Sequence, residues 1–489
     1  MNQLKMTENL KINFVFNIVY QVVAVLSPLV VTPKISRVFG VDYIGIKSYT
    51  FSIVYYFAIF GVLGLDMLRQ RRVALVKDDI NLRSREFWII YSTRFILVLI
   101  SSLGYVGYTF IAPLSQMERT VSFCWIIYLF REMINPIWFL QGIEKYRLLS
   151  ILGIISQVSY VLCTVIFVNY KNDLPLYIIF YTLIPLLISF CYFPPVLKSI
   201  VFIRPERKEM FSAVKESVIY FIPTVATAIY SMVDKTMLGL FDPQKISTGL
   251  YESAERLVKV ALAISTASFT IMRTRMSYLY GKRDPHGYAV TTKKFTSFSL
   301  MLCWPIMFGI IGISKDFVPI FFGEGFEEVI GLSYIFSLVI PCLTVSGLLQ
   351  AVFIFPYGLQ KTMDIYYGII VSINVVMNLV LISIMGTVGA IISSVFAEML
   401  LAVILVFRAR RSIDVKHIAT GSIKYITASV VMLFVMKYIS SVVLLNSISK
   451  VAIEFIVAIA VYFTVCIVLQ EEFVISQLKS FFIRIREIR

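Results

Sequence analysis

The sequence predicts an all-α protein that crosses a membrane many times. Of its 489 residues, 58% are hydrophobic and only 15% are charged, whereas a soluble domain of average composition carries about 25% charged residues. The apolar residues come in long blocks, many of them close to the roughly 20 residues that a helix needs to span a bilayer. No polar stretch is long enough for a soluble domain, and we expect about fourteen transmembrane helices.

Proline, glycine and charged residues separate the apolar blocks from one another. The N-terminal segment lacks a short apolar core followed by a small-residue cleavage site, so we expect the first block to remain as a span. The expected spans are residues 13–32, 45–65, 87–111, 120–140, 148–168, 176–197, 218–240, 250–272, 295–313, 329–355, 365–385, 388–407, 424–443 and 451–470.

The positive charges predict the orientation of these spans. The chain carries 45 Lys and Arg against 29 Asp and Glu. If the N-terminus is inside, most of the cations in loops fall on the inner side, which is the usual bias of membrane proteins. The sequence thus predicts a multi-pass protein of the plasma membrane with both ends inside. The same bias explains the net charge of +16 without a nucleic-acid partner.

Cysteine and histidine give no sign of a metal site. The six cysteines are scattered through apolar runs without a CxxC pair, and the two histidines lie in polar loops. Packing is the expected role of the cysteines. We expect no metal and no cofactor.

A polar stripe runs along the span at 250–272. Glu252, Glu255, Arg256 and Lys259 follow the spacing i, i+3, i+4 and i+7, which places them on one helix face. Glu252 can pair with Arg256 one turn further on. The same face continues with Ala263, Thr266, Thr270 and Arg273.

Two other spans have polar faces. The span at 13–32 carries a milder one, and Pro223 is expected to kink the span at 218–240. Because ionisable groups within spans usually face water or one another, the faces together predict a shared aqueous chamber. For Asp234–Lys235 and Glu252–Arg256 taken singly, charge pairs that merely lock helices together remain the alternative. The two faces consist of Asn13, Asn17 and Gln21, and of Tyr220, Thr224, Thr227, Ser231, Asp234 and Lys235.

Six cations lie within the expected spans, and they give the chamber its charge. Arg94 could extend to the inner surface. Arg131 precedes Glu132, but neighbouring helical residues point about 100° apart, so we do not expect them to pair side by side. A chamber with several cations suits an anionic cargo, and a phosphate-bearing headgroup is the expected class. The six are Lys47, Arg94, Arg131, Lys235, Arg256 and Lys259.

An internal repeat links the two halves of the chain. "VDYIGIKSYTFSI" (Val41–Ile53) and "KISTGLYESAERL" (Lys245–Leu257) align Gly45 with Gly249. About six spans separate the copies, so both have the same direction in the membrane, as in transporters built of parallel repeats. We expect an N-terminal six-helix lobe at 1–197, a basic cytoplasmic linker at 198–217, a C-terminal six-helix lobe at 218–407, and two extra helices with a basic cytoplasmic tail at 408–489.

Three stretches resemble bacterial polysaccharide-biosynthesis flippases of the multidrug/oligosaccharidyl-lipid/polysaccharide (MOP) exporter superfamily. They are "SPLVVTPKISRVFGVDYIGIKSYTFSIVYYFAIFGVLGL", "DKTMLGLFDPQKISTGLYESAERLVKV" and "GTVGAIISSVFAEML". Asp234 and Lys235 match the family's "D-K-x-M-L-G" segment, and Arg37 and Gly40 match "P-x-x-S-R-x-x-G". In "IMRTRMS" the chain departs from relatives that have a proline before the arginine, which leaves the inner end of that span less defined.

The resemblance implies a V-shaped pair of lobes, similar to multidrug exporters, that moves undecaprenyl-pyrophosphate-linked oligosaccharides across the plasma membrane by alternating access. It implies a role in making O-antigen or capsule, with glycosyltransferases and a polysaccharide polymerase as possible partners. A direction of transport requires either a coupling ion, H⁺ or Na⁺, or consumption of the cargo outside. We expect no catalytic residue. The expected substrate-binding residues are Asn17, Gln21, Lys47, Arg131, Lys235, Arg256 and Lys259, and the ion-coupling candidates are Asp234, Glu252, Glu255 and Glu398.

Two rival functions remain. A multidrug or cation antiporter of the same superfamily would have an acidic or aromatic cavity, whereas most of the span charges here are positive. A membrane-embedded polysaccharide polymerase would need an outer domain for its chemistry. The longest expected outer loop, near "SKDFVPIFFGEGFEEV", has acids but no partner base.

Overall fold

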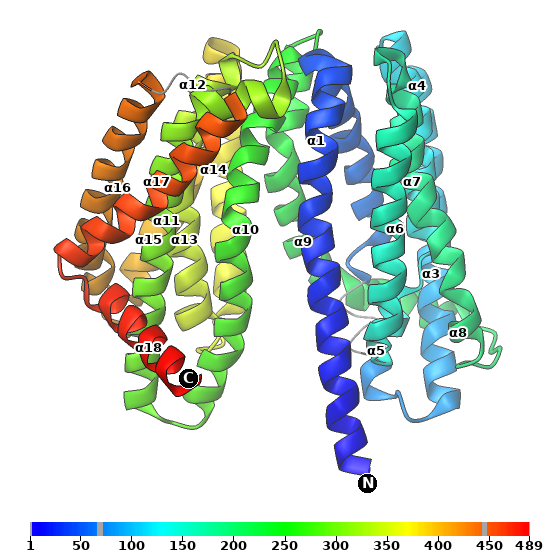
Figure 1. Ribbon diagram of the computed structural model, residues 1–489. Coiled ribbons are helices and arrows are strands. Elements are labelled where there is room, and N and C mark those ends of the chain that lie inside the picture. Colours follow the sequence, from blue (N-terminus) through cyan, green and yellow to red (C-terminus); the bar gives the residue numbers. More distant parts are fainter. Residues whose placement is uncertain (1, 66–71, 443–446, 489) are drawn as a thin grey trace. The chain divides into compact units, whose positions relative to one another are not determined.

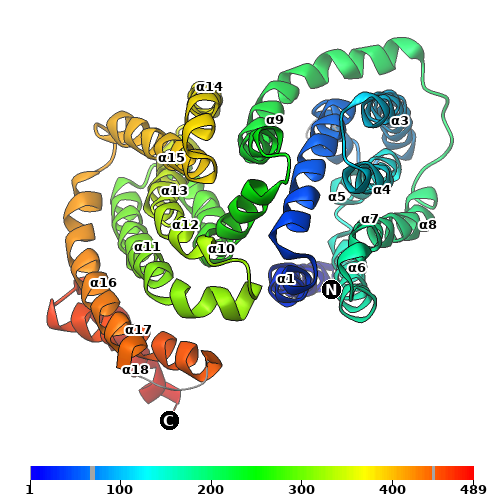
Figure 2. The same ribbon diagram turned by 90° about the horizontal axis from the view of Figure 1, so that it is seen from above.

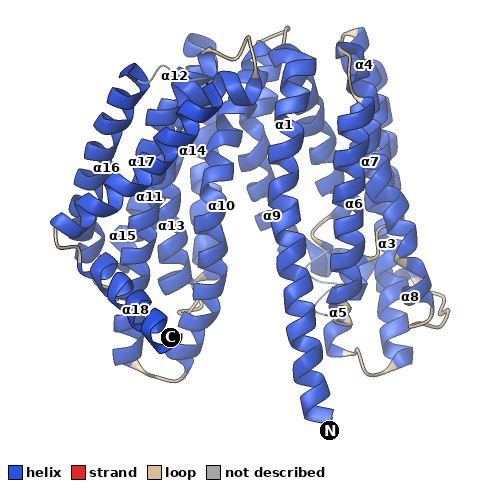
Figure 3. Cartoon of the chain, viewed as in Figure 1, coloured by secondary structure: helices blue, strands red, loops and turns tan. Residues whose placement is uncertain are grey.

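A computed structural model of the chain describes residues 2–65, 72–442 and 447–488. Side chains are described within these ranges except at 2–14, 220, 222, 223, 227, 264, 447 and 481–488. The described residues form helices and no strands (Figure 3). The chain divides into a first unit, Met1–Gly249, and a second unit, Leu250–Arg489.

The predicted fold class, an all-α polytopic membrane protein, is confirmed. Among the described residues, eleven helices are long and apolar enough to cross a membrane, or thirteen if two bent pairs each count as one span. The expected number of fourteen is not confirmed. The expected spans at 13–32 and 45–65 both lie in α1 (Asn2–Val62), which has non-helical backbone angles at Gly40. The division into lobes, linker and tail stays a prediction.

In the first unit the helices cross back and forth as a bundle (Figure 1). Asn135 and Pro136 break the span expected at 120–140 into α4 and α5, because proline cannot continue a helical hydrogen-bond ladder. The elements are α1 (Asn2–Val62), α3 (Ile80–Ile111), α4 (Gln116–Ile134), α5 (Ile137–Gly142), α6 (Tyr146–Phe167), η1 (Lys171–Asp173), α7 (Leu174–Cys191), α8 (Phe193–Leu197) and α9 (Arg207–Phe241).

Helix α1 consists of two rods joined at Gly40. This residue has φ 70° and ψ 179°, a backbone conformation that glycine adopts without the penalty that a Cβ would impose. The turn lies between the expected spans at 13–32 and 45–65, in the segment that carries Lys34, Arg37 and Asp42. The second rod carries Lys47 and the first copy of the repeat.

Helix α9 begins earlier than expected. Residues 198–217 were expected to be a linker, yet the chain is helical from Arg207 onward. The helix bends by 58° between Ile219 and Thr224, where a kink at Pro223 was predicted; the side chains of Tyr220, Pro223 and Thr227 are outside the described residues. Seen from above, α3, α4 and α6 are viewed nearly end-on, whereas the first segment of α9 runs lengthwise across the view (Figure 2).

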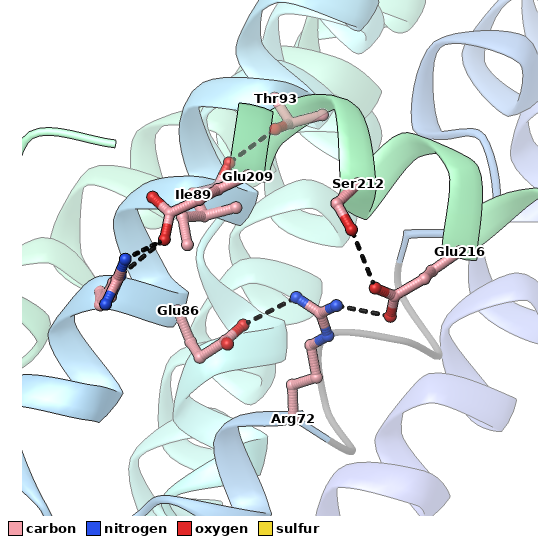
Figure 4. Close-up of polar contacts among 8 residues, drawn as sticks. Arg72, Glu86, Ile89, Thr93, Glu209, Ser212 and Glu216 are labelled. Atoms are coloured by element: carbon pink, nitrogen blue, oxygen red, sulfur yellow. Dashed lines mark hydrogen bonds and ion pairs between the residues drawn. The ribbon is translucent and has the colours of Figure 1, made fainter. Parts of the chain in front are cut away.

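Ion pairs hold this first segment of α9 against Arg72 and α3 of the same unit (Figure 4). Arg72 lies between two carboxylates, with Nη1 3.2 Å from Glu86 Oε2 and Nη2 2.5 Å from Glu216 Oε2. Arg85 binds Glu209 at 2.5 Å, about two helical turns before Glu216. Burial lowers the pKa of the Arg72 guanidinium, but hydrogen bonds and charge attraction from Glu216 and Glu86 outweigh it and leave this pKa raised. The segment is thus docked by charge.

In the second unit, α16 and α17 pack on α11, and the expected basic tail forms α18. Helix α10 bends by 44° between Ala263 and Ser265. The elements are α10 (Ile246–Gly281, whose first turn belongs to the first unit), α11 (Pro285–Phe322), α12 (Glu328–Phe336), α13 (Val339–Leu349), η2 (Gln350–Ile354), α14 (Gln360–Met385), α15 (Thr387–Ala409), α16 (Lys416–Val442), α17 (Ser447–Val468) and α18 (Glu472–Ile488).

Candidate functional site

Three of the predicted site residues are buried charged side chains of the first unit. Lys47 is on the second rod of α1, and Asp234 and Lys235 are on the second segment of α9; their exposed fractions are 9%, 6% and 7%. Burying a charge is costly unless it is paired and hydrogen-bonded. Ionisable groups in apolar helices usually pair with one another or face water, so these three residues stay the predicted candidates of the first unit.

Hydroxyl groups fix the helices that carry these charges. Thr236, next to Lys235, donates a hydrogen bond to Ser52 on α1 at 2.8 Å. The Tyr56 hydroxyl lies 3.1 Å from the Thr236 hydroxyl. A side chain added at Gly239 would overlap the ring of Tyr49. This part of α9 therefore runs in close contact with the rod of α1 that carries Lys47.

A buried ion pair that sequence reasoning missed lies at the start of the second repeat copy. Lys245 Nζ is 3.1 Å from Glu118 Oε1, and the two side chains are 10% and 6% exposed. The ammonium also lies 4.6 Å from the centre of the Tyr49 ring, a cation–π contact. Glu118 belongs to the capping box of α4 with Ser115. Lys245 falls between the expected spans at 218–240 and 250–272, so it was not among the charges assigned to spans.

Arg94 and Arg131 do not behave as the sequence suggested. Arg94 is 2% exposed and binds Glu132 at 2.7 Å and the Asn135 carbonyl at 3.0 Å, so it does not extend to a surface. Arg131 also binds Glu132, at 2.5 Å. The expectation that adjacent residues would not pair was wrong, because the long arginine side chain bends back to its neighbour. Arg131 is the more accessible cation, with a side chain 25% exposed.

In the second unit the predicted stripe on α10 forms two ion pairs along one helix face. Arg256 binds Glu252 at 2.6 Å, which confirms the predicted pair, and Lys259 binds Glu255 at 2.7 Å. Both carboxylates are buried, whereas the Lys259 side chain is 60% exposed. The cations thus lie outward of the acids that balance them and are the more accessible members.

The stripe ends at a cavity of about 330 Å³ within the second unit. Glu398, predicted as an ion-coupling candidate, lines this cavity from α15 and is 6% exposed. The guanidinium of Arg273 lies 3.7 Å from the centre of the Phe355 ring. Besides Glu398, the polar residues that line the cavity are Thr266, Thr270, Arg273, Ser346, Gln350 and Tyr367. Sequence reasoning found the face on α10 but not the residues of α13 and α14.

The remaining predicted residues, Asn17 and Gln21, lie exposed on the first rod of α1; Asn13 is outside the described side chains. The predicted set is divided between the units. The first holds Asn17, Gln21, Lys47, Arg131, Asp234 and Lys235, and the second holds Glu252, Glu255, Arg256, Lys259 and Glu398. The shared chamber stays a prediction.

A second polar cluster that the sequence did not single out joins α14 to α15. Asn374 and Asn378 are both fully buried. Asn374 donates a hydrogen bond to Ser393 at 3.0 Å, and the two asparagines contact each other at 3.3 Å. Two asparagines at i and i+4 in an apolar span were the signal, but polar faces were identified only in the spans at 13–32, 218–240 and 250–272.

Comparison with known sequences identifies the family. The profile of a family described as "Polysaccharide biosynthesis protein" matches residues 10–272 of the chain. The chain belongs to this family. A curated family relative, the "Putative O-antigen transporter" of Escherichia coli (strain K12), is 25% identical over 34% of the chain. The "Probable low-salt glycan biosynthesis flippase Agl15" of Haloferax volcanii is 24% identical over 39% of it. Each alignment spans 40% of the relative's own length.

Solved structures place this polysaccharide biosynthesis protein in a known fold. A structure titled "Lipid II flippase MurJ, inward closed conformation" matches with a TM-score of 0.74 and 16% identity, over 94% of this chain and 98% of that one. An inward-facing multidrug resistance MATE family transporter of the MOP superfamily matches with a TM-score of 0.61 and 11% identity, over 80% and 94%. These likenesses establish the fold.

Proposed function

We propose that this protein is a flippase that moves undecaprenyl-pyrophosphate-linked oligosaccharide units from the cytoplasmic to the outer leaflet of the plasma membrane. Its membership of a polysaccharide biosynthesis family supports the substrate class. The names of its relatives and its fold support transport rather than polymerisation. The observation that carries the proposal is the burial of Lys47 and Lys235 within membrane-crossing helices.

The physical task explains why buried cations are needed. A sugar-pyrophosphate head cannot cross lipid unaided, because an ion without partners is very costly in an apolar medium. The prenyl tail stays in lipid, since each CH₂ buried there is worth about 0.8 kcal/mol. The protein supplies charge-assisted hydrogen bonds to phosphate from Lys47, Arg131 and Lys235 of the first unit and from Arg256 and Lys259 of the second. Asn17 and Gln21 offer amide groups to the sugar.

The ion pairs of α10 suggest how cargo and a coupling ion are linked. Arg256 and Lys259 are balanced by Glu252 and Glu255 before cargo arrives. A pyrophosphate that binds the two cations displaces the carboxylates, which then take up H⁺ or Na⁺. Asp234 and Glu398 are the further candidates for ion uptake. Alternating access with both chain ends in the cytoplasm completes the proposal, and no covalent bond changes.

The test is glycan export in cells that lack the protein. We expect lipid-linked units to accumulate on the cytoplasmic side, and Arg256→Ala and Lys259→Ala proteins to restore export poorly. Lys437→Ala is the matched control, because Lys437 is an exposed cation on α16. Full export by both variants at normal expression would refute the role of these cations. Normal export with increased drug sensitivity in the deletion strain would favour the multidrug antiporter.

A further inference from the structure

A charged cluster within the second unit has no part in the proposed site. Asp316 on α11 forms an ion pair with Lys450, whose Nζ lies 2.8 Å from Asp316 Oδ1. Its other oxygen accepts a hydrogen bond from the Ser440 hydroxyl, on α16, at 2.5 Å. Lys450 is on α17, so three helices meet at one carboxylate. Asp316 belongs to the acidic stretch "SKDFVPIFFGEGFEEV", in which no partner base was found from sequence.

Glu454 lies one helical turn after Lys450 and is fully buried, with an exposed fraction of 0%. Neither of its carboxylate oxygens accepts a hydrogen bond from any donor that the structure describes. Its electrostatic neighbours are Asp316, which repels it, and Lys450 and the Ser440 hydroxyl, which are already bonded to Asp316. Tyr334 on α12 is a further titratable group that faces Asp316.

These contacts determine which carboxyl group is charged. Asp316 has an ammonium and a hydroxyl as donors, so it is the ionised member. Glu454 has neither, and a buried ionised carboxylate without a donor is strongly disfavoured. When two carboxyl groups share a site, one of them keeps its proton. A proton on Glu454 also turns an acceptor into a donor, which can then bond to Asp316.

We propose that Glu454 and Asp316 form a proton-binding site in which Glu454 holds the proton. A metal ion is the less suitable ligand, because the Lys450 ammonium already neutralises Asp316 at this position. The site joins α11 to the two helices α16 and α17, outside the set of acids predicted from the sequence.

The site can link protonation to helix movement. A shift of α17 relative to α11 that brings water or a donor to Glu454 releases the proton, and the reverse movement takes it up, since a ligand and a conformation bias each other equally. The link between this protonation and transport rests on the proposed flippase function. It makes the C-terminal helices a proton-sensitive element of the transport cycle.

The first test is infrared spectroscopy of the purified full-length protein in lipid. We expect the C=O stretching band of a protonated carboxyl group at neutral pH and its loss in Glu454→Gln. Glu472→Gln, at an exposed position on α18, should keep the band. Because glutamine resembles a protonated glutamate, Glu454→Gln should also unfold at an unchanged temperature. An unchanged band in Glu454→Gln would overturn the proposal.

The second test is headgroup translocation in proteoliposomes with and without an imposed pH gradient. Glu454→Gln should lose the response to the gradient and keep the basal rate, while Glu472→Gln keeps both. An equal response in Glu454→Gln and the unmodified protein would contradict the link to transport. Absence of translocation by every form would instead refute the flippase function and leave the infrared result standing.

Discussion

Gly45 packs against the backbone carbonyl of Lys245, and Gly249 packs against that of Val41. The contacts are reciprocal, because Val41 and Gly45 of the first repeat copy align with Lys245 and Gly249 of the second. Each copy thus presents its glycine to the first residue of the other, as in a two-fold symmetric interface. The short pattern that linked the two halves in sequence therefore also links these segments in space.

This reciprocity predicts that an alanine at either glycine destabilises the protein. A Cβ at either position would overlap a backbone carbonyl, and overpacking costs about 1–3 kcal/mol. We expect Gly45→Ala and Gly249→Ala to lower the unfolding temperature by similar amounts. Gly309→Ala is the control, since no atom lies near a Cβ there. Equal unfolding temperatures for all three variants would disprove the close contact.

Glu132 is predicted to be essential for folding, because it neutralises two arginines. In Glu132→Gln the buried Arg94 loses its counter-charge, and breaking a buried pair costs about 3–5 kcal/mol. Thermal unfolding and expression level measure the loss. The control is Glu144→Gln, whose pair with Lys77 is exposed and should matter little. The double variant Arg94→Met with Glu132→Gln should recover much of the stability; failure to recover would argue against an uncompensated charge as the cause.

The ion pairs of Arg72 are predicted to hold the first segment of α9. In Arg72→Gln, Glu216 and Glu86 lose their shared cation, so we expect faster deuterium exchange in Arg207–Ile219. High salt should have the same effect on the unmodified protein, because it screens exposed charges. Lys77→Gln removes a neighbouring cation that contacts Glu144 instead. If deuterium exchange in Arg72→Gln is as slow as in the unmodified protein, apolar contacts and not these ion pairs hold the segment.

Accessibility to water separates the predicted chamber from a dry ion-pair lock. Single cysteines at Lys259, Lys235 and Lys47 in a cysteine-free protein can be probed with a charged thiol reagent in intact membranes. We expect rapid labelling at position 259, where the side chain is 60% exposed, and slower but cargo-sensitive labelling at 235 and 47. Cysteine in place of Leu348, a buried apolar residue, is the unreactive control. Labelling at position 235 that is no faster than at position 348 would contradict the predicted aqueous chamber.

The sequence by itself determined the class of protein and the location of its spans. Hydrophobic length and the 3.6-residue period are local properties, so the expected spans fall on helices, although three of them are each divided between consecutive helices. The stripe of Glu252, Arg256 and Lys259 was found on one face. The family was also readable, because its motifs are contiguous. A break between 32 and 45 was also expected, but not its form, in which a single glycine joins two helical rods.

Only the tertiary structure decided which charges of different helices pair and which remain accessible. Arg94 meets Glu132 across 38 residues, and Lys450 meets Asp316 across 134. Such partners are selected by how helices pack, and packing depends on the shapes of many side chains at once. A charge in an apolar span therefore shows from sequence that a partner or water must be near. Which of the two it is depends on the neighbouring helix, and that information is not contained in any single stretch of chain.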